Sequence, residues 1–260
     1  MTCKCFFVEQ ADTRGGPVTF TGATAHHMER VARLRVGDTI ELRDGQGNAW
    51  LGSIDAMGRG AVSVRILGDA EGHRESPLEL TLAMAFSRAD RMDWSLRQAV
   101  EIGIHRFVAF RSRRSQYGLN EKEAAARRQR WWKIAREAMC QCGRVKIPEI
   151  NILPDLDRYV SQTVHEAAGP SEVLKIVACE EGPRRGLLDL WSQTPWCKQF
   201  HAVIGPEGGW SPEDLELLFR AGFQSVHLGP RVLRMETAST VLLGAVQLLW
   251  GDFHVAQEGV

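Results

Sequence analysis

The stretch HAVIGPEGGWSPEDLELLF (residues 201–219) decides the fold class, because an apolar strand runs through a glycine-rich loop straight into a helix. Ser211 and Pro212 are residue types typical of a helix N-cap and of the first helical position. The loop contains three glycines, Gly205, Gly208 and Gly209. Such loops lie at the carboxyl ends of strands in open α/β sheets, where main-chain amides bind ligands. The stretch therefore predicts an α/β sheet with a ligand site at that edge.

A second loop, in VHLGPRVLRMETASTVLL (residues 226–243), repeats this arrangement. Its strand ends at Leu228, the chain turns through Gly229 and Pro230, and a long apolar helix follows. Neither loop carries the Lys-Ser or Lys-Thr of a triphosphate cradle, and the nicotinamide fingerprint G-x-G-x-x-G and the nucleophile motif G-x-S-x-G are absent. Ordinary turn geometry is the alternative for either loop alone. Together the loops predict a cleft rimmed by main chain without identifying its ligand.

The segment after residue 77 alternates strand and helix patterns. Residues 78–86 form a continuous apolar run, typical of a buried parallel strand. Residues 90–103 follow as a helix with one apolar stripe, made by Met92, Leu96 and Val100. Further strands are expected at residues 104–110, 173–179, 200–204 and 224–229. This alternation predicts an α/β layer architecture with a mostly parallel sheet.

The segment before residue 68 reads as short strands separated by glycine and aspartate turns. It predicts a small antiparallel barrel of about 70 residues. One helix is expected at residues 24–34, with Met28, Val31 and Leu34 on its buried face. The polar stretch at residues 68–77 is the best candidate for a linker.

A basic block lies within a chain of zero net charge. Residues 103–150 carry 12 Lys and Arg against 4 Asp and Glu, whereas residues 151–260 carry 8 against 14. The block includes a long helix expected from Asn120, with Glu123 as capping-box partner, to a stop at Gly143. Such a concentration of positive charge favours a polyanionic partner.

The composition indicates an ordinary globular protein, with 44% hydrophobic and 25% charged residues. There is no leader and no run of 18 apolar residues, so we expect neither secretion nor a membrane span, and a cytoplasmic protein. Six cysteines, two pairs of them spaced C-x-C, favour reduced thiols over a zinc site. No metal is expected.

Five stretches resemble one known family, in the expected order and over nearly the whole chain. They are HHMERVARLRVGDTIELRDGQG (26–47), DRMDWSLRQAVEIGI (90–104), QCGRVKIPEI (141–150), IGPEGGWSPEDLELLFRAGF (204–223) and LGPRVLRMETAS (228–239). The family is the RsmE family of 16S rRNA uracil-N3 methyltransferases, which belongs to the knotted SPOUT class. The resemblance implies methylation of a uridine N3 in the 16S ribosomal RNA of the small ribosomal subunit, with S-adenosylmethionine as cofactor.

The resemblance also implies the architecture. Residues 1–72 would form a PUA-like (OB-like) β-barrel that binds RNA, and residues 73–260 a SPOUT-type α/β trefoil-knot domain. A homodimer is implied, with each cofactor pocket near the interface. The apolar stretch at residues 238–250 fits a helix buried on more than one side, although a core helix within a monomer would look the same.

The site residues are carried over by their positions in the family's motifs. The cofactor role goes to Ile204, Gly205, Glu207, Gly208, Gly209, Leu228, Gly229, Val232 and Leu233. Arg234 would clamp a phosphate or the cofactor's carboxylate, unless Arg231 and Arg234 merely form ion pairs with Glu207 or Glu236. Glu236 is a candidate base for the uridine N3 proton, although a carboxylate that stabilises the first helical turn is the alternative.

RNA contacts are expected from the basic block. The expected basic residues are Arg111, Arg113, Arg114, Arg127, Arg128, Arg130, Lys133, Arg136 and Arg144, with Arg33 and Arg35 of the barrel in addition. The resemblance also implies Gln141, Gly143 and Arg144 as RNA-binding candidates. Trp131 and Trp132 could stack on bases, but we expect one of them to be core and the other half-exposed. A solvated helix face is the alternative for the charges.

Three departures from the family's pattern affect this interpretation. Lys4 stands alone where the family is rich in arginine, Cys140 replaces a glutamate, and Arg113 replaces an acidic residue. Because both cofactor loops are intact, an active methyltransferase is the first hypothesis. A catalytically silent RNA-binding or ribosome-assembly protein that keeps the fold is the second. A nicotinamide oxidoreductase lacks its fingerprint.

Overall fold

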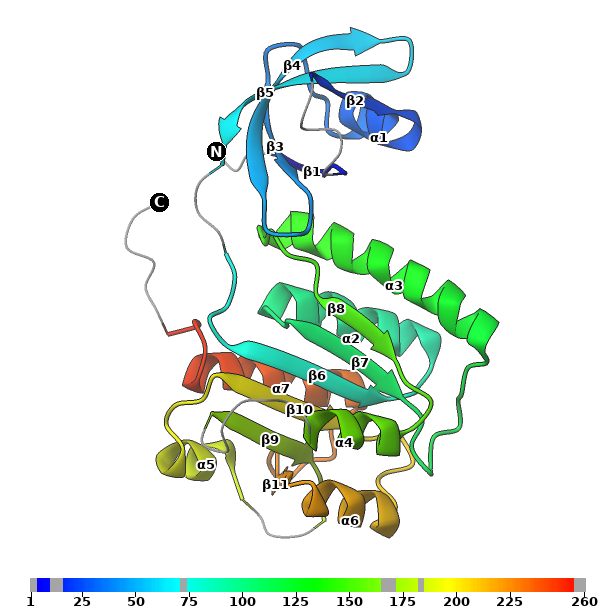
Figure 1. The fold of residues 1–260 in the computed structure, drawn as a ribbon, viewed down its shortest axis with the longest axis vertical. Coiled ribbons are helices and arrows are strands. Elements are labelled where there is room, and N and C mark those ends of the chain that lie inside the picture. Colours follow the sequence, from blue (N-terminus) through cyan, green and yellow to red (C-terminus); the bar gives the residue numbers. More distant parts are fainter. Residues whose placement is uncertain (1–3, 10–15, 71–73, 165–171, 182–184, 255–260) are drawn as a thin grey trace. The chain divides into compact units, whose positions relative to one another are not determined.

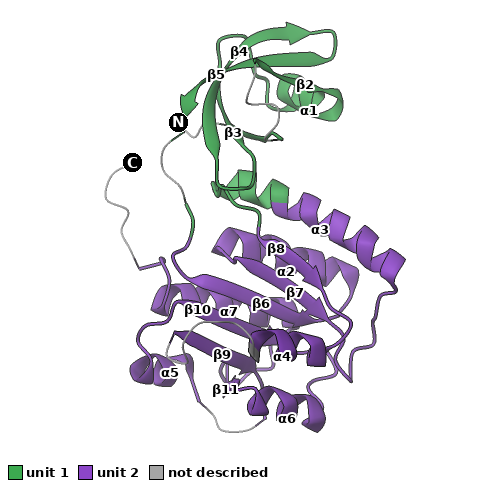
Figure 2. Cartoon of the chain, viewed as in Figure 1, with its two compact units in different colours: residues 1–75, 136–147 green, residues 76–135, 148–260 purple. Residues whose placement is uncertain are grey.

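The computed structural model describes residues 4–9, 16–70, 74–164, 172–181 and 185–254. The chain forms two compact units, one made of residues 1–75 and 136–147 and the other of residues 76–135 and 148–260 (Figure 2). The boundary expected between residues 72 and 73 falls outside the described residues. No helix in the described ranges combines the length and the apolar character that a membrane span needs.

Unit 1 contains a five-stranded sheet with the strand order β1-β3-β4-β5-β2 (Figure 1). Its strands are β1 (Lys4–Phe7), β2 (Val18–Thr21), β3 (Thr39–Arg43), β4 (Ala49–Gly58) and β5 (Ala61–Asp69). Three strand pairs are antiparallel, but β1 runs parallel to β3. The prediction of a wholly antiparallel barrel is therefore wrong at β1. The pattern of β-forming residues locates strands but does not show which strands pair.

The helix expected at residues 24–34 starts earlier than predicted and ends earlier, at Val31. Helix α1 (Gly22–His26) continues as the π-helical turn η2 (His27–Val31). Met28 is fully buried as predicted, but Val31 is 65% exposed, so its assignment to the buried face is wrong. A π-helical turn has more residues than an α-helical one, which shifts the buried face out of the 3.6-residue period.

Helix α3 (Glu121–Cys142) begins in unit 2 and ends in unit 1 (Figure 2). The predicted capping box is confirmed: the Asn120 amide donates to Glu123 and the Glu123 amide donates to Asn120, both at 2.9 Å. The helix ends, as predicted, at Gly143, whose φ of +91° suits glycine. Within unit 1, Arg43 donates to the carbonyl oxygen of Arg144 at 2.8 Å and so fixes the segment after the helix.

Unit 2 contains a six-stranded sheet with the order β11-β9-β10-β6-β7-β8, in which every neighbouring pair is parallel (Figure 1). Its strands are β6 (Glu79–Ala85), β7 (Arg106–Phe110), β8 (Glu149–Ile152), β9 (Val173–Ala178), β10 (Gln199–Ile204) and β11 (Gln224–Val226). Its helices besides α3 are α2 (Ala89–Ile102), α4 (Leu156–Val164), α5 (Leu187–Gln193), α6 (Pro212–Arg220) and α7 (Met235–Leu249). The predicted α/β architecture with a mostly parallel sheet is confirmed.

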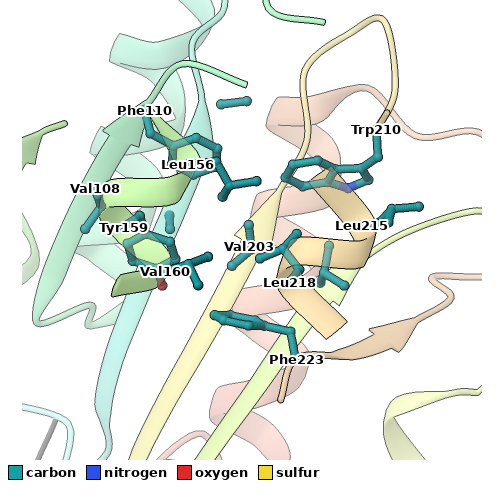
Figure 3. Packing of buried hydrophobic residues seen from close by; sticks show 13 residues of the cluster. Val108, Phe110, Leu156, Tyr159, Val160, Val203, Trp210, Leu215, Leu218 and Phe223 are labelled. Carbon is teal, nitrogen blue, oxygen red and sulfur yellow. The ribbon is translucent and has the colours of Figure 1, made fainter. Parts of the chain in front are cut away.

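Helices cover both faces of this sheet, because side chains alternate along each strand. On β10, Val203 packs into an apolar cluster with side chains of α4 and α6 (Figure 3). Phe200, on the opposite face, lies with its ring centroid 5.3 Å from that of Trp250, which follows α7. Helix α2 packs against α7, and its predicted stripe of Met92, Leu96 and Val100 is fully buried. The sheet is thus a rigid, buried support for the loops at its edge.

Candidate active site

A pocket of about 570 Å³ lies at the carboxyl ends of three adjacent strands, β11, β9 and β10. Both glycine loops line it, one between β10 and α6 and the other between β11 and α7. The residues that the sequence assigned to the cofactor all lie on its wall: Ile204, Gly205, Glu207, Gly208, Gly209, Leu228, Gly229, Val232 and Leu233, together with Arg231 and Arg234. The fold therefore brings the two predicted loops together into one site.

Gly205 lies against the indole ring of Trp210. A Cβ at residue 205 would come 2.8 Å from Cε2 of Trp210, too close for any side chain. Trp210 cannot give way easily, since its Nε1 donates to the carbonyl oxygen of Ala178 at 3.0 Å and its ring stacks on Phe110 (Figure 3). The indole thus links the pocket to the core, and only glycine fits at residue 205.

Two other glycines are required for their backbone conformation. Gly209 has a φ of +71° and Gly229 a φ of +99°, which side chains rarely adopt. Directly after the first loop, the predicted N-cap is confirmed, because the Ser211 hydroxyl accepts a hydrogen bond from the Asp214 amide at 3.1 Å. The loop conformation and the helix start are therefore both fixed by local chemistry.

A third wall of the pocket was not found in the sequence. It consists of Cys179, Glu180 and Glu181, which follow β9. Strand β9 lies between β11 and β10 in the sheet, so its end is enclosed by the two glycine loops. Burial raises the pKa of the Cys179 thiol, which therefore stays neutral. This wall adds two carboxylates to a lining that also contains Arg231 and Arg234.

The acidic residues of the loops pair with an arginine that the sequence did not suggest. Arg91, in the first turn of α2, lies 3.1 Å from Glu207 and 4.0 Å from Glu236. The alternative that Arg231 or Arg234 pairs with these carboxylates is wrong for the described residues. Glu236 lies in the first turn of α7, as its alternative interpretation predicted, and it is not among the described residues that line the pocket. Its role as the base for the N3 proton stays a prediction.

The residues predicted to bind RNA fall into exposed and engaged groups. Seven residues are exposed, and their side chains form no hydrogen bond or ion pair within the described ranges: Arg33, Arg35, Arg111, Arg114, Arg128, Lys133 and Gln141. Engaged are Arg113 with Asp214, Arg130 with Asp93, Arg127 over the ring of Trp131, Arg136 over the ring of Phe7 and Arg144 with Glu75. Trp131 is fully buried and Trp132 is 38% exposed, which confirms that one is core.

Arg113 and Arg114 lie beside the first glycine loop. A Cβ at Gly208 would come 3.3 Å from the carbonyl oxygen of Arg114, and Arg113 Nη1 lies 2.5 Å from the buried carboxylate of Asp214. The acidic partner of residue 113 thus comes from α6. The exposed charge of Arg114 is in this way held next to the pocket.

Arg144 is the predicted RNA-binding residue that the structure places least favourably, because it is buried. Its guanidinium donates to Glu75, which also accepts from the amides of Val145 and Lys146 at 2.9 Å. Burial tends to raise the pKa of Glu75, but the bonds and charge of Arg144 and the two amides outweigh it, so this pKa lies below its ordinary value. In this structure Arg144 stabilises unit 1 rather than facing a phosphate.

Replacing Glu75 with Gln should destabilise unit 1 by about 3 kcal/mol at pH 7, because it removes the carboxylate charge that pairs with the buried guanidinium of Arg144. Since the pKa of Glu75 is lowered by folding, its contribution is complete above the ordinary carboxyl value of 4.5 and is lost as pH falls further. Urea unfolding at pH 7 and at pH 4 measures this. An equal loss of stability for wild type and Glu75→Gln on acidification would contradict the assignment.

In the described residues, no three His, Cys, Asp or Glu side chains gather as metal ligands would.

Two domain families match the chain. Residues 74–247 match the RNA methyltransferase domain, and residues 20–67 match the RNA methyltransferase PUA domain. The first match covers the parallel sheet and the whole pocket, and the second covers most of the sheet of unit 1. Fold and site therefore define a class: RNA methyltransferases with a SPOUT-type α/β domain preceded by a PUA-like domain.

Individual relatives narrow the class. The chain is 29% identical to ribosomal RNA small subunit methyltransferase E of Bacillus subtilis, over 94% of this chain and 95% of that protein. It is 31% identical to the enzyme of the same name from Synechocystis sp., over 89% of this chain and 73% of that protein. The crystal structure of ribosomal RNA small subunit methyltransferase E from Neisseria gonorrhoeae, bound to S-adenosylmethionine, has a TM-score of 0.82 at 31% identity and covers 97% of this chain and 100% of that one. A Legionella pneumophila protein in complex with the same cofactor has a TM-score of 0.84 at 29% identity, over 97% of this chain and 100% of that one.

This chain belongs to the ribosomal RNA small subunit methyltransferase E family, which confirms the predicted family and fold class.

Proposed function

We propose that the protein transfers a methyl group from S-adenosylmethionine to the N3 atom of a uridine in the 16S ribosomal RNA of the small subunit. The observation that carries this proposal is the single pocket that both glycine loops share at the carboxyl ends of β10 and β11. Relatives that match most of this chain are named for methylation of small-subunit ribosomal RNA, and two related structures hold S-adenosylmethionine. The test is mass spectrometry of nucleosides after incubation of the protein with 16S RNA, or with small subunits, and cofactor. We expect 3-methyluridine at one position, and its absence from both substrates would refute the proposal.

The pocket fits this cofactor in size and in chemistry. Its volume of about 570 Å³ lies within the usual range for ligand sites, roughly 300–1,000 Å³. Ile204, Leu228 and Leu233 offer apolar surface for an adenine ring, and the glycines expose main-chain donors and acceptors. The cofactor, when bound, supplies an activated methyl group on a positively charged sulfur. Glu180 and Glu181 place negative charge on one wall, which favours such a cation.

Arg234 has the role of holding an anionic group in the pocket. It is exposed at the N-cap of α7, lines the pocket and has no ion pair with any of the described residues. A guanidinium in this position can bind either a phosphate of the RNA or the carboxylate of the cofactor by two parallel hydrogen bonds. We therefore assign to Arg234 the orientation of the two reactants relative to each other.

RNA binding is assigned to residues 1–72 and to the exposed charges of α3. Arg128 and Lys133 are exposed, and neither has an ion pair in the described part of the chain. Replacing both with Ala should lower RNA affinity about tenfold at low salt and reduce the slope of log affinity against log salt by about 1.5. Filter binding across a salt series measures both quantities. The matched control is Arg158→Ala with Lys198→Ala, which removes equal charge outside the basic block. An equal loss in the control would contradict a specific basic surface.

The homodimer expected from the resemblance is proposed to form through α7. Val241 and Leu248 on this helix are 48% and 54% exposed, and Trp94 on the neighbouring α2 is 54% exposed. Large apolar side chains exposed on two packed helices favour burial against a second copy. Light scattering should give the mass of two chains, and Val241→Glu with Leu248→Glu should give one. A wild-type mass of one chain would rule the dimer out.

We also propose that the protein is located in the cytoplasm.

A further inference from the structure

Charged side chains gather at the pocket wall around Glu207, one of the residues to which the sequence assigned the cofactor role. Glu207 lines the pocket, and its Oε1 accepts hydrogen bonds from the buried Ser87 hydroxyl and from Nη1 of Arg91, the latter at 3.1 Å. Within the described residues, its Oε2 has no hydrogen-bond partner. One oxygen of this carboxylate is thus anchored, and the other is available to a ligand.

Arg91 of α2 contacts carboxylates from two distant parts of the chain, the first glycine loop and α7. It belongs to the first turn of α2, and its Nε lies 4.0 Å from Oε1 of Glu236 in the first turn of α7. The side chain of Glu236 is only 18% exposed, and its Oε2 is buried without a hydrogen-bond partner in the described structure. A buried carboxylate costs free energy unless it is paired, so Arg91 is its compensation. Glu236 in turn holds Arg91 in place.

We infer that Glu207 is the catalytic residue that accepts the N3 proton of uridine, that Arg91 is its positioning residue, and that Glu236 anchors Arg91. This inference rests on the proposed methyl transfer. The proton at N3 moves to Oε2 of Glu207, and the N3 electron pair forms the new bond to the methyl carbon. The electron pair of the breaking carbon–sulfur bond stays on sulfur. The imide N–H is a poor nucleophile until this proton leaves, which is why a placed acceptor accelerates the reaction.

Geometry favours Glu207 over Glu236 for this role. Glu207 lines the pocket and has an available oxygen, whereas Glu236 is not among the described lining residues. Two hydrogen bonds to one oxygen of Glu207 fix the direction of the other, as an aligned proton acceptor requires. The charged groups that face it from the surrounding elements are Arg91 of α2, Arg231 and Arg234 of the second loop, Glu180 and Glu181 after β9, and Glu236 of α7 through Arg91.

The test compares Glu207→Gln, Arg91→Ala, Arg91→Lys and Glu236→Gln in rate, in cofactor affinity by calorimetry and in dependence on pH. We expect Glu207→Gln to lower kcat about 100-fold, with cofactor affinity changed less than about threefold. Its rate should rise with pH, because hydroxide increasingly removes the N3 proton unaided. Arg91→Ala should behave similarly with a smaller loss, and Arg91→Lys should restore part of it. Glu236→Gln should have no further effect in the Arg91→Ala background.

The matched control is Glu213→Gln, an exposed carboxylate after the same loop that is not part of the pocket lining, and it should keep the wild-type rate and pH profile. A Glu207→Gln enzyme with a kcat within about threefold of wild type would overturn the inference, as would a loss that is the same at every pH. The inference would also be overturned if Glu236→Gln, and not Glu207→Gln, lost rate at neutral pH and recovered it at high pH. That result would make Glu236 the proton acceptor. Failure of the proposed function is distinct, since the wild-type protein would then form no 3-methyluridine.

Discussion

Replacing Arg234 with Ala should slow methyl transfer about 100-fold, the loss typical when one placed electrostatic group is removed from an active site. Arg234 lines the pocket at the start of α7, and its exposed side chain has no ion pair in the described residues. Its removal therefore leaves no buried group unpaired, and the melting temperature should change little. Single-turnover rates with saturating cofactor, measured beside thermal unfolding, separate the two effects.

The matched control for Arg234 is Arg220→Ala. Arg220 is an exposed arginine at the end of α6, where it forms a surface ion pair with Glu216. Surface pairs contribute little, so both the rate and the stability should stay close to wild type. If Arg234→Ala lost rate only in proportion to a loss of folded protein, Arg234 would be a structural residue and not part of the methyl-transfer site.

Replacing Gly205 with Ala should abolish measurable cofactor binding and lower the free energy of unfolding by about 1–3 kcal/mol. The new Cβ would lie 2.8 Å from Trp210, whose indole is hydrogen-bonded to Ala178 and stacked on Phe110. Either the ring or the loop must move, and both belong to the pocket wall. Titration calorimetry with S-adenosylmethionine and urea unfolding measure the two losses.

Gly68 provides the control for Gly205. It lies in β5, has no atom within 4 Å of the position of a Cβ and has no positive φ. Gly68→Ala should therefore bind cofactor as wild type does, with unchanged or slightly higher stability. Undiminished cofactor binding by Gly205→Ala would show that the close approach to Trp210 does not shape the site.

Local chemistry explains what could be predicted from the sequence. The cap at Ser211, the capping box of Asn120 and Glu123, and the stop at Gly143 depend on residues within four positions of each other. The continuous apolar run at residues 78–86 likewise indicated a strand buried on both faces. Both glycine loops were found because glycine next to a strand end is itself the signal.

What could not be predicted depends on contacts between distant residues. The order of strands in the sheet places the end of β9 between the two loops, and no local pattern shows that order. Arg91 lies 116 positions before Glu207 along the chain, so its pairing is visible only in three dimensions. Contacts between distant residues also decide that β1 pairs in parallel with β3 and that residues 136–147 belong to unit 1. The sequence predicts that Arg144 contacts RNA, whereas in the structure Arg144 forms an ion pair with Glu75.

The proposed methyl transfer requires that the two glycine loops form a main-chain binding site for S-adenosylmethionine. A crystal structure of the protein grown with this cofactor would show that site. We expect electron density for the cofactor between Gly205 and Gly229, with its adenine against Ile204 and Leu228 and its methyl group directed towards Glu207. Density at any other place on the chain, with the two loops closed on each other, would contradict it.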